Sequence, residues 1–436
     1  MLPLCLFRMT VFLVLRYRKA FQKADILILP QKLNFCTSVM APDIAARNYP
    51  DRHIVFVTFD YERTNKYVEC IWDNTDDIEY VLIPNSYLSF TLFGKRIVIP
   101  SDEVLERYGG RMVAFIAGCL GSPQEIYTSR GWLGNVGLPP QCWEDLHKAL
   151  SGAVKPEWAD YWESSAYFAV YYHLKFEVCR PAPSLPRNLL NKVEAALLKA
   201  RPDYRSFRSC GLYLKKGKMT ISDDDPHIFD GSPFTNYLPA VRLLNERGYQ
   251  VFLTGDRSLP EEVHKEFDGM FVNGESLGVD PMLFNVYAAL HTDIFVGDNA
   301  GGMGFAGLID SRPMLALNTY QFFSSFSNIW IYYKHAYHRD GRHLSFEEMT
   351  GKYAYTPAAD RLLHVEVNSA EEIREAVGFY LDEIENPGSS EIDESLENLW
   401  PSYSMFKLGR SHISPAYVRN YYQKISQTSA HPLAPR

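Results

Sequence analysis

Short apolar runs alternate with helical patterns along the first half of the chain. The runs ADILILP (24–30), HIVFVTF (53–59) and IEYVLIP (78–84) are rich in β-branched and aromatic residues, which is typical of buried strands. The intervening segments SVMAPDIAARNYP and TNKYVECIWDN have helix-like patterns. Strands separated by helical segments of this length predict βαβ units and a parallel sheet.

The same alternation returns in the second half. Predicted strands lie in CGLYLKKG (210–217), YQVFLTG (249–255), DIFVGDN (293–299) and PMLALN (313–318), with a shorter one in FDGMFVNG. The helical pattern LPAVRLLNERG has Pro near its first turn and Gly at its stop, which matches the usual asymmetry of helix ends. The second half is therefore predicted to be a second α/β series.

A proline-rich segment, CRPAPSLPRN at 179–188, separates the two series and is the best linker candidate. The predicted class is α/β, with two Rossmann-like domains facing a cleft. The expected organisation is an N-terminal apolar and basic helix at 1–22, an acceptor domain at 23–180, a hinge at 181–205, a donor domain at 206–380, and an acidic loop with a C-terminal helix at 381–436.

Composition narrows the function classes. The 436 residues are 46% hydrophobic and 22% charged, which is ordinary for a globular protein. A net charge of −8 argues against a broad basic surface and hence against nucleic acid as a partner. The seven cysteines are scattered and contain no C-x-x-C pair, which indicates a reducing compartment and predicts a cytoplasmic protein without a zinc site.

The first segment, MLPLCLFRMTVFLVLRYRKAF, is apolar from Leu2 to Leu15 except for Arg8. It is too short and too charged for a membrane-spanning helix. One interpretation is a helix packed on the first domain. Another is an interfacial helix at the inner face of the membrane, with Arg16, Arg18 and Lys19 meeting anionic headgroups. A degenerate signal peptide is the third.

A glycine-rich stretch, HTDIFVGDNAGGMGFAGLIDSRPMLALN at 291–318, has G-x-G-x-x-G spacing at Gly302, Gly304 and Gly307. A dinucleotide fold needs this motif in its first βα turn and an acid about 20 residues later. Here the motif comes late and the next strand ends at Asn318 without an acid. We therefore expect no redox cofactor.

The same turn can still bind an anion. Backbone N–H groups at a helix start are unpaired, and the helix dipole favours negative charge there. A nucleotide diphosphate therefore suits residues 299–304. The alternative is that the turn needs glycine only for its backbone conformation.

These segments resemble a known family. NYLPAVRLLNERGYQVFLTGD (236–256), the glycine-rich turn and IYYKHAYHRDGRHLSFEEM (331–349) are similar to a bacterial family of GT-B-fold glycosyltransferases from surface-polysaccharide clusters, distantly similar to heptosyltransferases. The likeness covers about 209–349 and reaches the first half only by strand order. It implies a GT-B-like fold and metal-independent transfer of a sugar from a nucleotide-diphosphate-sugar to a glycan or lipid-linked acceptor, without a cofactor.

The chain departs from that family at one strand end. The family's first C-terminal strand carries histidine and arginine near its end, where this chain has Tyr213 and Lys215. Lysine keeps the positive charge but lacks the bidentate fork of arginine that suits phosphate. The lysine of the heptosyltransferase loop is also absent, with Glu275 nearby.

The candidate donor-binding residues follow from strand ends and from the resemblance. Lysine charges and helix amides would stabilise the leaving diphosphate. Asp298 would either form a hydrogen bond to a hydroxyl of the nucleotide sugar or cap the next helix. The full set is Lys215, Lys216, Gly255, Asp256, Asn273, Glu275, Asp298, Asn299, Ala300, Gly301, Gly302, Gly304 and Lys334.

Two further groups of acidic residues bear on the chemistry. Asp60 and Glu62, just after the second strand, are candidates to deprotonate the acceptor. The acidic SDDDPH (222–227) is best explained as a solvated loop, so no metal site is expected. Two alternative functions stay open: a nucleotide-sugar epimerase of GT-B fold, and a non-catalytic nucleotide-sugar-binding or scaffold protein, which the departures at Tyr213 and Lys215 would favour.

Overall fold

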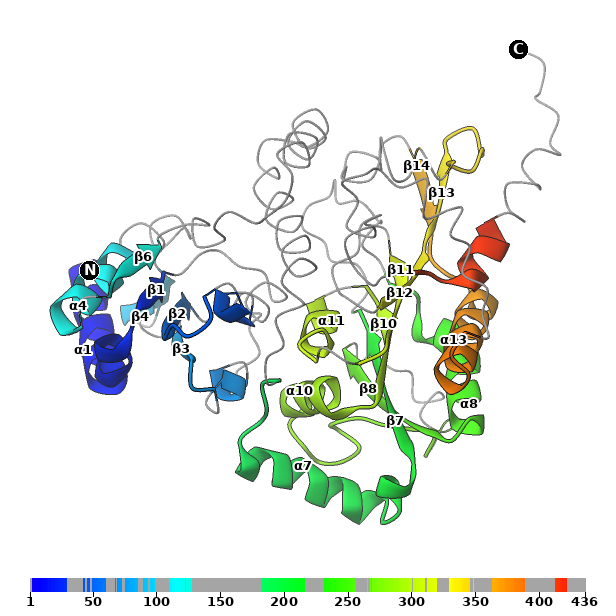
Figure 1. Ribbon diagram of the computed structural model, residues 1–436, viewed down its shortest axis with the longest axis horizontal. Coiled ribbons are helices and arrows are strands. Elements are labelled where there is room, and N and C mark those ends of the chain that lie inside the picture. Colours follow the sequence, from blue (N-terminus) through cyan, green and yellow to red (C-terminus); the bar gives the residue numbers. More distant parts are fainter. Residues whose placement is uncertain are drawn as a thin grey trace. The chain divides into compact units, whose positions relative to one another are not determined.

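The structure is a computed structural model, and the chain falls into two compact units that divide in the first turn of α7 (Arg187–Ala200) (Figure 1). The structure describes residues 2–29, 42–43, 45–47, 49–59, 67, 69–72, 75–84, 89–92, 95–98, 110–121, 123–127, 182–215, 231–255, 265, 267, 269–299, 301–309, 312–319, 329–345, 348, 363–388 and 412–421.

The first unit is built on a parallel sheet. Its strand order is β3-β2-β1-β6, and every pairing is parallel. The strands are β1 (Ile26–Ile28), β2 (Ile54–Phe59), β3 (Ile78–Ile83) and β6 (Glu125–Tyr127). A separate antiparallel pair joins β4 (Ser89–Leu92) to β5 (Lys95–Val98). The parallel sheet predicted from the strand and helix alternation is confirmed.

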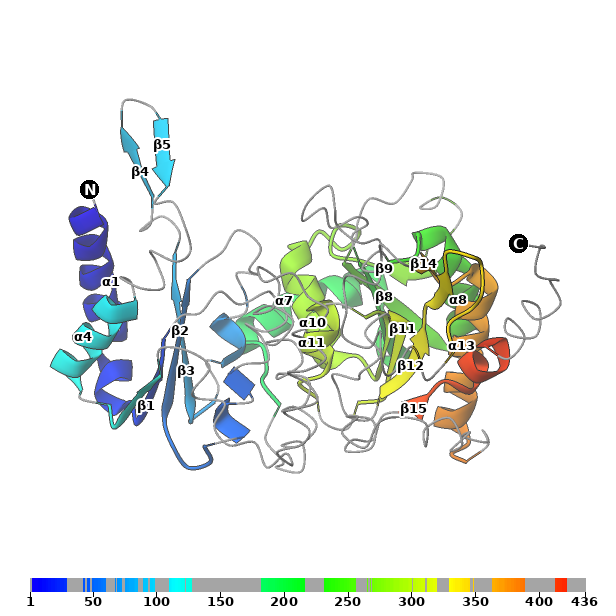
Figure 2. The ribbon, with the colours of Figure 1, turned by 90° about the horizontal axis from the view of Figure 1, so that it is seen from above.

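Two helices cover one face of this sheet. The buried side of α1 (Leu2–Lys23) contributes Met9, Leu13 and Phe21 to a core with strand residues such as Val55, and α4 (Gly110–Leu120) adds Val113. Figures 1 and 2 show α1 and α4 side by side. The first helix is therefore packed on the first unit along one side, as the first interpretation of that segment expected.

The second unit contains a seven-stranded, all-parallel sheet in the order β15-β12-β11-β10-β7-β8-β9. The chain starts in the middle at β7, moves outward through β8 and β9, and then returns to the other side of β7 with β10, β11 and β12. This is the order of doubly wound nucleotide-binding folds. The strands are β7 (Arg208–Leu214), β8 (Tyr249–Gly255), β9 (Phe271–Val272), β10 (Ile294–Asp298), β11 (Met314–Thr319), β12 (Ile329–Tyr333) and β15 (His412–Ile413).

Helices cover both faces of the second sheet. In both ribbon views α8 (Phe234–Glu246) and α13 (Ala370–Glu385) lie on one side, and α7, α10 (Pro281–His291) and α11 (Gly301–Ala306) on the other (Figures 1 and 2). Such two-sided cover explains why the strands are continuous apolar runs without alternation. The strands β13 (His335–His338) and β14 (Leu363–Glu366) form a separate antiparallel pair. The predicted α/β class is confirmed in both units.

One boundary differs from the prediction. Residues 381–385, predicted to begin an acidic loop, form the last turn of α13. The helix continues because Leu381 extends its buried stripe, which includes Ile373, Val377 and Tyr380. A capping box at the other end, in which Ser369 and Glu372 exchange hydrogen bonds with each other's backbone N–H, fixes where α13 begins.

Candidate functional site

The centre of the second sheet brings two predicted segments together. Lys215 directly follows β7, and Asp298 ends β10, the strand paired with β7. The backbone N–H of Lys215 donates to Oδ2 of Asp298 at 2.9 Å, although the residues are 83 positions apart. Because the strand order reverses between β7 and β10, this pair lies at the topological switch point of the sheet, where α/β folds bind ligands at the carboxyl ends of the strands.

The Asp298 carboxylate holds this strand end together. It is 1% exposed, and its Oδ1 accepts from the Tyr237 hydroxyl at 2.6 Å and from Nδ2 of Asn318 at 2.7 Å. Burial raises the pKa of Asp298, against the opposing effects of these hydrogen bonds and of the Lys334 charge. Sequence reasoning expected a donor ligand or a helix cap, whereas the structure shows a carboxylate that joins β7, α8 and β11.

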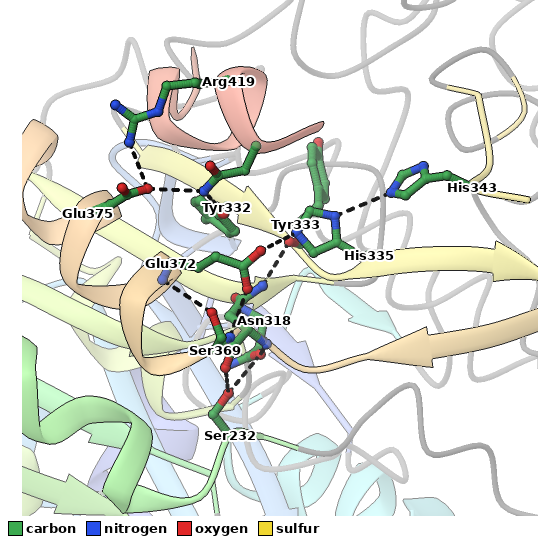
Figure 3. Close-up of polar contacts among 12 residues, drawn as sticks. Ser232, Asn318, Tyr332, Tyr333, His335, His343, Ser369, Glu372, Glu375 and Arg419 are labelled. Carbon is green, nitrogen blue, oxygen red and sulfur yellow. Dashed lines mark hydrogen bonds and ion pairs between the residues drawn. The ribbon is translucent and has the colours of Figure 1, made fainter. Parts of the chain in front are cut away.

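A reciprocal asparagine pair continues this network. The Asn318 backbone N–H donates to Oδ1 of Asn368 at 2.6 Å, and the Asn368 N–H donates to Oδ1 of Asn318 at 2.7 Å. Asn318 has a φ of 51°, a left-handed conformation that asparagine tolerates better than most residues. Ser232 donates to the same Oδ1 at 3.1 Å (Figure 3). The end of β11 is thereby fixed to the segment that starts α13.

Two histidines extend the chain of contacts from the start of α13. Nε2 of His335 lies 2.7 Å from Oε1 of Glu372, and its Nδ1 lies 3.2 Å from Nε2 of His343 (Figure 3). Nδ1 of His343 contacts the Leu344 carbonyl at 2.7 Å and must donate to it. A proton on either His335 Nδ1 or His343 Nε2 satisfies the contact between the two rings, and His335 Nε2 can donate to the Glu372 carboxylate.

A tyrosine ring packs directly against the glycine-rich turn. A Cβ placed on Gly302 would overlap the ring of Tyr213, and one on Gly297 would overlap the Tyr213 backbone. Gly302 is therefore needed because Tyr213 approaches closely. The alternative predicted from the sequence was that this turn needs glycine to adopt a positive φ. It does not apply to Gly302, whose φ is not positive.

The other predicted donor residues lie along the same edge or outside the described parts. Lys334 follows β12 and is 1% exposed, with its charge acting on Asp298. Gly255 ends β8, with a left-handed φ of 88°. Asn273 follows β9, and its Oδ1 accepts from the N–H of Ser276 at 2.8 Å. Glu275 is exposed in that same turn.

Three further candidates lie at the start of α11 or just before it. Asn299 follows β10, and Gly301 and Gly304 belong to α11. Lys216, Asp256, Ala300, Asp60 and Glu62 lie outside the described residues. Within the described ranges no group of three His, Cys, Asp or Glu side chains could hold a metal ion. None of the helices that the structure describes has the length and apolar character needed to cross a bilayer.

Sequence reasoning missed the residues that support the site. Asn318 carried a usable signal, since a polar residue at the end of a buried strand points to the carboxyl edge of the sheet. Tyr237 and Asn368 carried no such signal in the sequence. Tyr237 has the pattern of an amphipathic helix, and Asn368 that of a loop. Their roles depend on contacts over 61 and 50 residues.

Two buried tyrosines give a matched test of this network. Tyr237→Phe removes a hydrogen bond to a buried carboxylate and should lower the free energy of unfolding by about 2 kcal/mol. Tyr380→Phe is the control, because its buried hydroxyl has no hydrogen-bond partner among the described residues and its loss should be neutral or slightly stabilising. Urea unfolding measures both. Equal costs for the two variants would contradict the network.

The chain matches no protein-family model and no curated protein. It is similar to the solved structure of a glycosyl transferase family 9 protein from Veillonella parvula DSM 2008, with 10% identity, a TM-score of 0.43, and coverage of 83% of this chain and 99% of that one.

Two E. coli proteins show weaker likeness. The ADP-heptose lps heptosyltransferase II is 13% identical over 76% of this chain and 95% of its own, with a TM-score of 0.36. The heptosyltransferase WaaC with ADP-2-deoxy-2-fluoro heptose is 12% identical over 70% and 92%, with a TM-score of 0.34. The case for a nucleotide site therefore rests on this chain's own strand order and on the residues at its switch point.

Proposed function

We propose that this protein is a glycosyltransferase that moves a sugar from a nucleotide-diphosphate-sugar to an acceptor in cell-surface glycan synthesis. The observation that carries the proposal is the switch point of the second sheet, where the end of β7, the end of β10 and the glycine-rich start of α11 meet. Doubly wound folds bind nucleotides at this place. The family resemblance of residues 209–349 supports the same reading.

The proposed chemistry needs positive charge at the diphosphate. As the anomeric carbon–oxygen bond of the donor breaks, the nucleoside diphosphate leaves with the bonding electrons, and the acceptor oxygen bonds to that carbon and loses a proton. Lys215, Lys216 and Lys334 would stabilise the charge of the leaving group without a metal ion, together with the amides of residues 299–304. Asp60 and Glu62 are the proposed candidates to accept the proton.

The rest of the donor would extend along the strand ends. Gly255 ends β8, and Asn273 and Glu275 follow β9, on the side of β7 away from β10. Asp256 is the next residue after Gly255 in the sequence. All four are proposed to contact the base or ribose. Asp298 is proposed to act indirectly, by holding the Lys215 backbone in place. The first unit would bind a glycan or lipid-linked acceptor at the inner face of the membrane.

The enzymatic test uses the full chain with ADP-, UDP-, GDP-, CDP- and dTDP-sugars. Release of a nucleoside diphosphate that depends on an added acceptor extract is the expected result. Epimerised sugar without acceptor would identify the epimerase alternative. Tight binding of a nucleotide sugar without any turnover would identify the non-catalytic alternative. No binding and no turnover across the panel would reject the proposal.

Lys215→Met gives a directed version of this test. The variant loses the ammonium group but keeps the backbone N–H that Asp298 accepts. Transfer should fall by about 10²-fold, since a single lost transition-state contact of this kind costs that order of rate. Lys199→Met, an exposed lysine in the last turn of α7, is the matched control and should keep full activity. Equal rates for both variants would remove Lys215 from the proposed site.

A further inference from the structure

An apolar ridge runs along the outside of α1 and α4. Phe7, Val11 and Leu15 are 65%, 40% and 80% exposed, and their spacing of four residues places them on one face of α1. Phe115 on α4 is 68% exposed. These residues are four of the eight large hydrophobic side chains exposed in the described parts of the chain. Such grouping marks an interaction site, whereas scattered exposed residues are ordinary.

The two helices present their outer sides in the same direction. The inner sides of α1 and α4 share one core with Leu27, Val55 and Val81, which lie on one face of the first sheet. Both helices therefore cover that face, and they lie beside each other (Figures 1 and 2). Because Phe7, Val11, Leu15 and Phe115 are opposite the buried residues of their helices, they form one outer surface of this unit.

The charged residues of α1 and α4 have a single sign. Neither α1 nor α4 contains an acidic residue, although the chain as a whole carries a net charge of −8. Arg16 lies 3.6 Å from Glu69 and over the Phe12 and Tyr17 rings. The basic residues of the two helices, all exposed, are Arg8, Arg16, Arg18, Lys19, Lys23 and Arg111.

We infer that the outer surface of α1 and α4 lies on an anionic bilayer. The apolar ridge would enter the boundary between headgroups and acyl chains, and Arg18 and Lys19 would meet the phosphates, as in interfacial amphipathic helices. A second copy of the chain fits less well, because a two-fold contact through this surface would place basic residues against basic residues. The inference goes beyond sugar transfer and does not depend on it.

The test is sedimentation of the full chain with vesicles, without any nucleotide sugar. Vesicles of phosphatidylcholine containing about one-third phosphatidylglycerol should retain the protein, and pure phosphatidylcholine should not. Retention should decrease with added salt. Substituting both Arg18 and Lys19 by Gln should weaken the partition coefficient by roughly fivefold per residue, and Leu15→Asp by about tenfold.

Matched controls come from α7, which carries an exposed leucine and an exposed lysine. Leu198→Asp and Lys199→Gln should leave vesicle binding unchanged. Thermal unfolding of every variant checks that the fold is intact. Equal losses from the α7 and α1 variants, absence of binding to anionic vesicles, or a concentration-dependent dimer that Leu15→Asp disrupts without any vesicle binding would each overturn the inference. Vesicle binding without sugar transfer would instead reject only the proposed function.

Discussion

Replacing Asp298 with alanine should lower the free energy of unfolding of the second unit by about 3–5 kcal/mol, the usual cost of breaking a buried charged network. The carboxylate accepts hydrogen bonds from the Lys215 backbone, the Tyr237 hydroxyl and the Asn318 amide. All three donors would lose their acceptor in a region that is closed to water. The nearby buried Lys334 would also lose the attraction of this carboxylate.

Urea unfolding followed by circular dichroism measures this effect. Asp298→Asn keeps one oxygen for Tyr237 and Asn318 but turns an NH₂ group toward the Lys215 N–H, so its cost should be intermediate. Glu275→Ala removes an exposed acid on the same edge and should change stability by about 0.5 kcal/mol or less. If Asp298→Ala unfolded within about 1 kcal/mol of wild type, the carboxylate would not hold this strand end.

Gly302→Ala is expected to abolish nucleoside diphosphate binding and to lower stability by about 1–3 kcal/mol, the usual cost of forcing atoms into a packed site. The new Cβ would overlap the Tyr213 ring, so either the ring or the first turn of α11 must move. Because the turn supplies the proposed phosphate-binding amides, a small displacement suffices to remove binding. Thermal shift with a panel of nucleoside diphosphates measures both quantities.

The overlap predicts a non-additive pair. In a Tyr213→Ala background the Gly302→Ala change should cost little, because the ring that it meets is gone. Gly378→Ala in α13 is the glycine control: its Cβ would meet Leu243 at an ordinary 3.6 Å, and stability should rise by about 0.5–1 kcal/mol. If the losses in free energy of unfolding from Tyr213→Ala and Gly302→Ala were additive, the contact between the Tyr213 ring and the turn would not explain the glycine at 302.

Local patterns predicted β7 to β11 of the second unit but not β12 to β15. The apolar runs ending at Leu214, Gly255, Asp298 and Asn318 are all strands, because each is buried on both faces and reads as an unbroken apolar segment. The prediction failed at 381–385, where the partly buried acidic residues Asp382, Glu383 and Glu385 of α13 resembled a loop. The end of such a helix depends on how far its buried apolar residues continue, as well as on the polarity of the local sequence.

The assembly of the site could not be predicted in the same way. The central place of β7 arises from pairing with strands about 40 and 80 residues later in the chain, and sequence spacing does not encode that order. The role of Asp298 depends on Tyr237 and Asn318, which approach it only after the sheet has formed. The G-x-G-x-x-G spacing suggested a cofactor motif, yet the demand for glycine at 302 comes from Tyr213 on the neighbouring strand.

Hydrogen–deuterium exchange with the nucleoside diphosphate that gives the largest thermal shift tests the central claim most directly. The switch-point site predicts slower exchange in peptides covering 211–216 and 296–306, the ends of β7 and β10 and the start of α11, with smaller changes at 255–256 and 273–276. The amides of α1 and β6, in the first unit, should exchange as before. Protection confined to the first unit, or no protection at 296–306 despite saturating ligand, would contradict a donor site at this switch point.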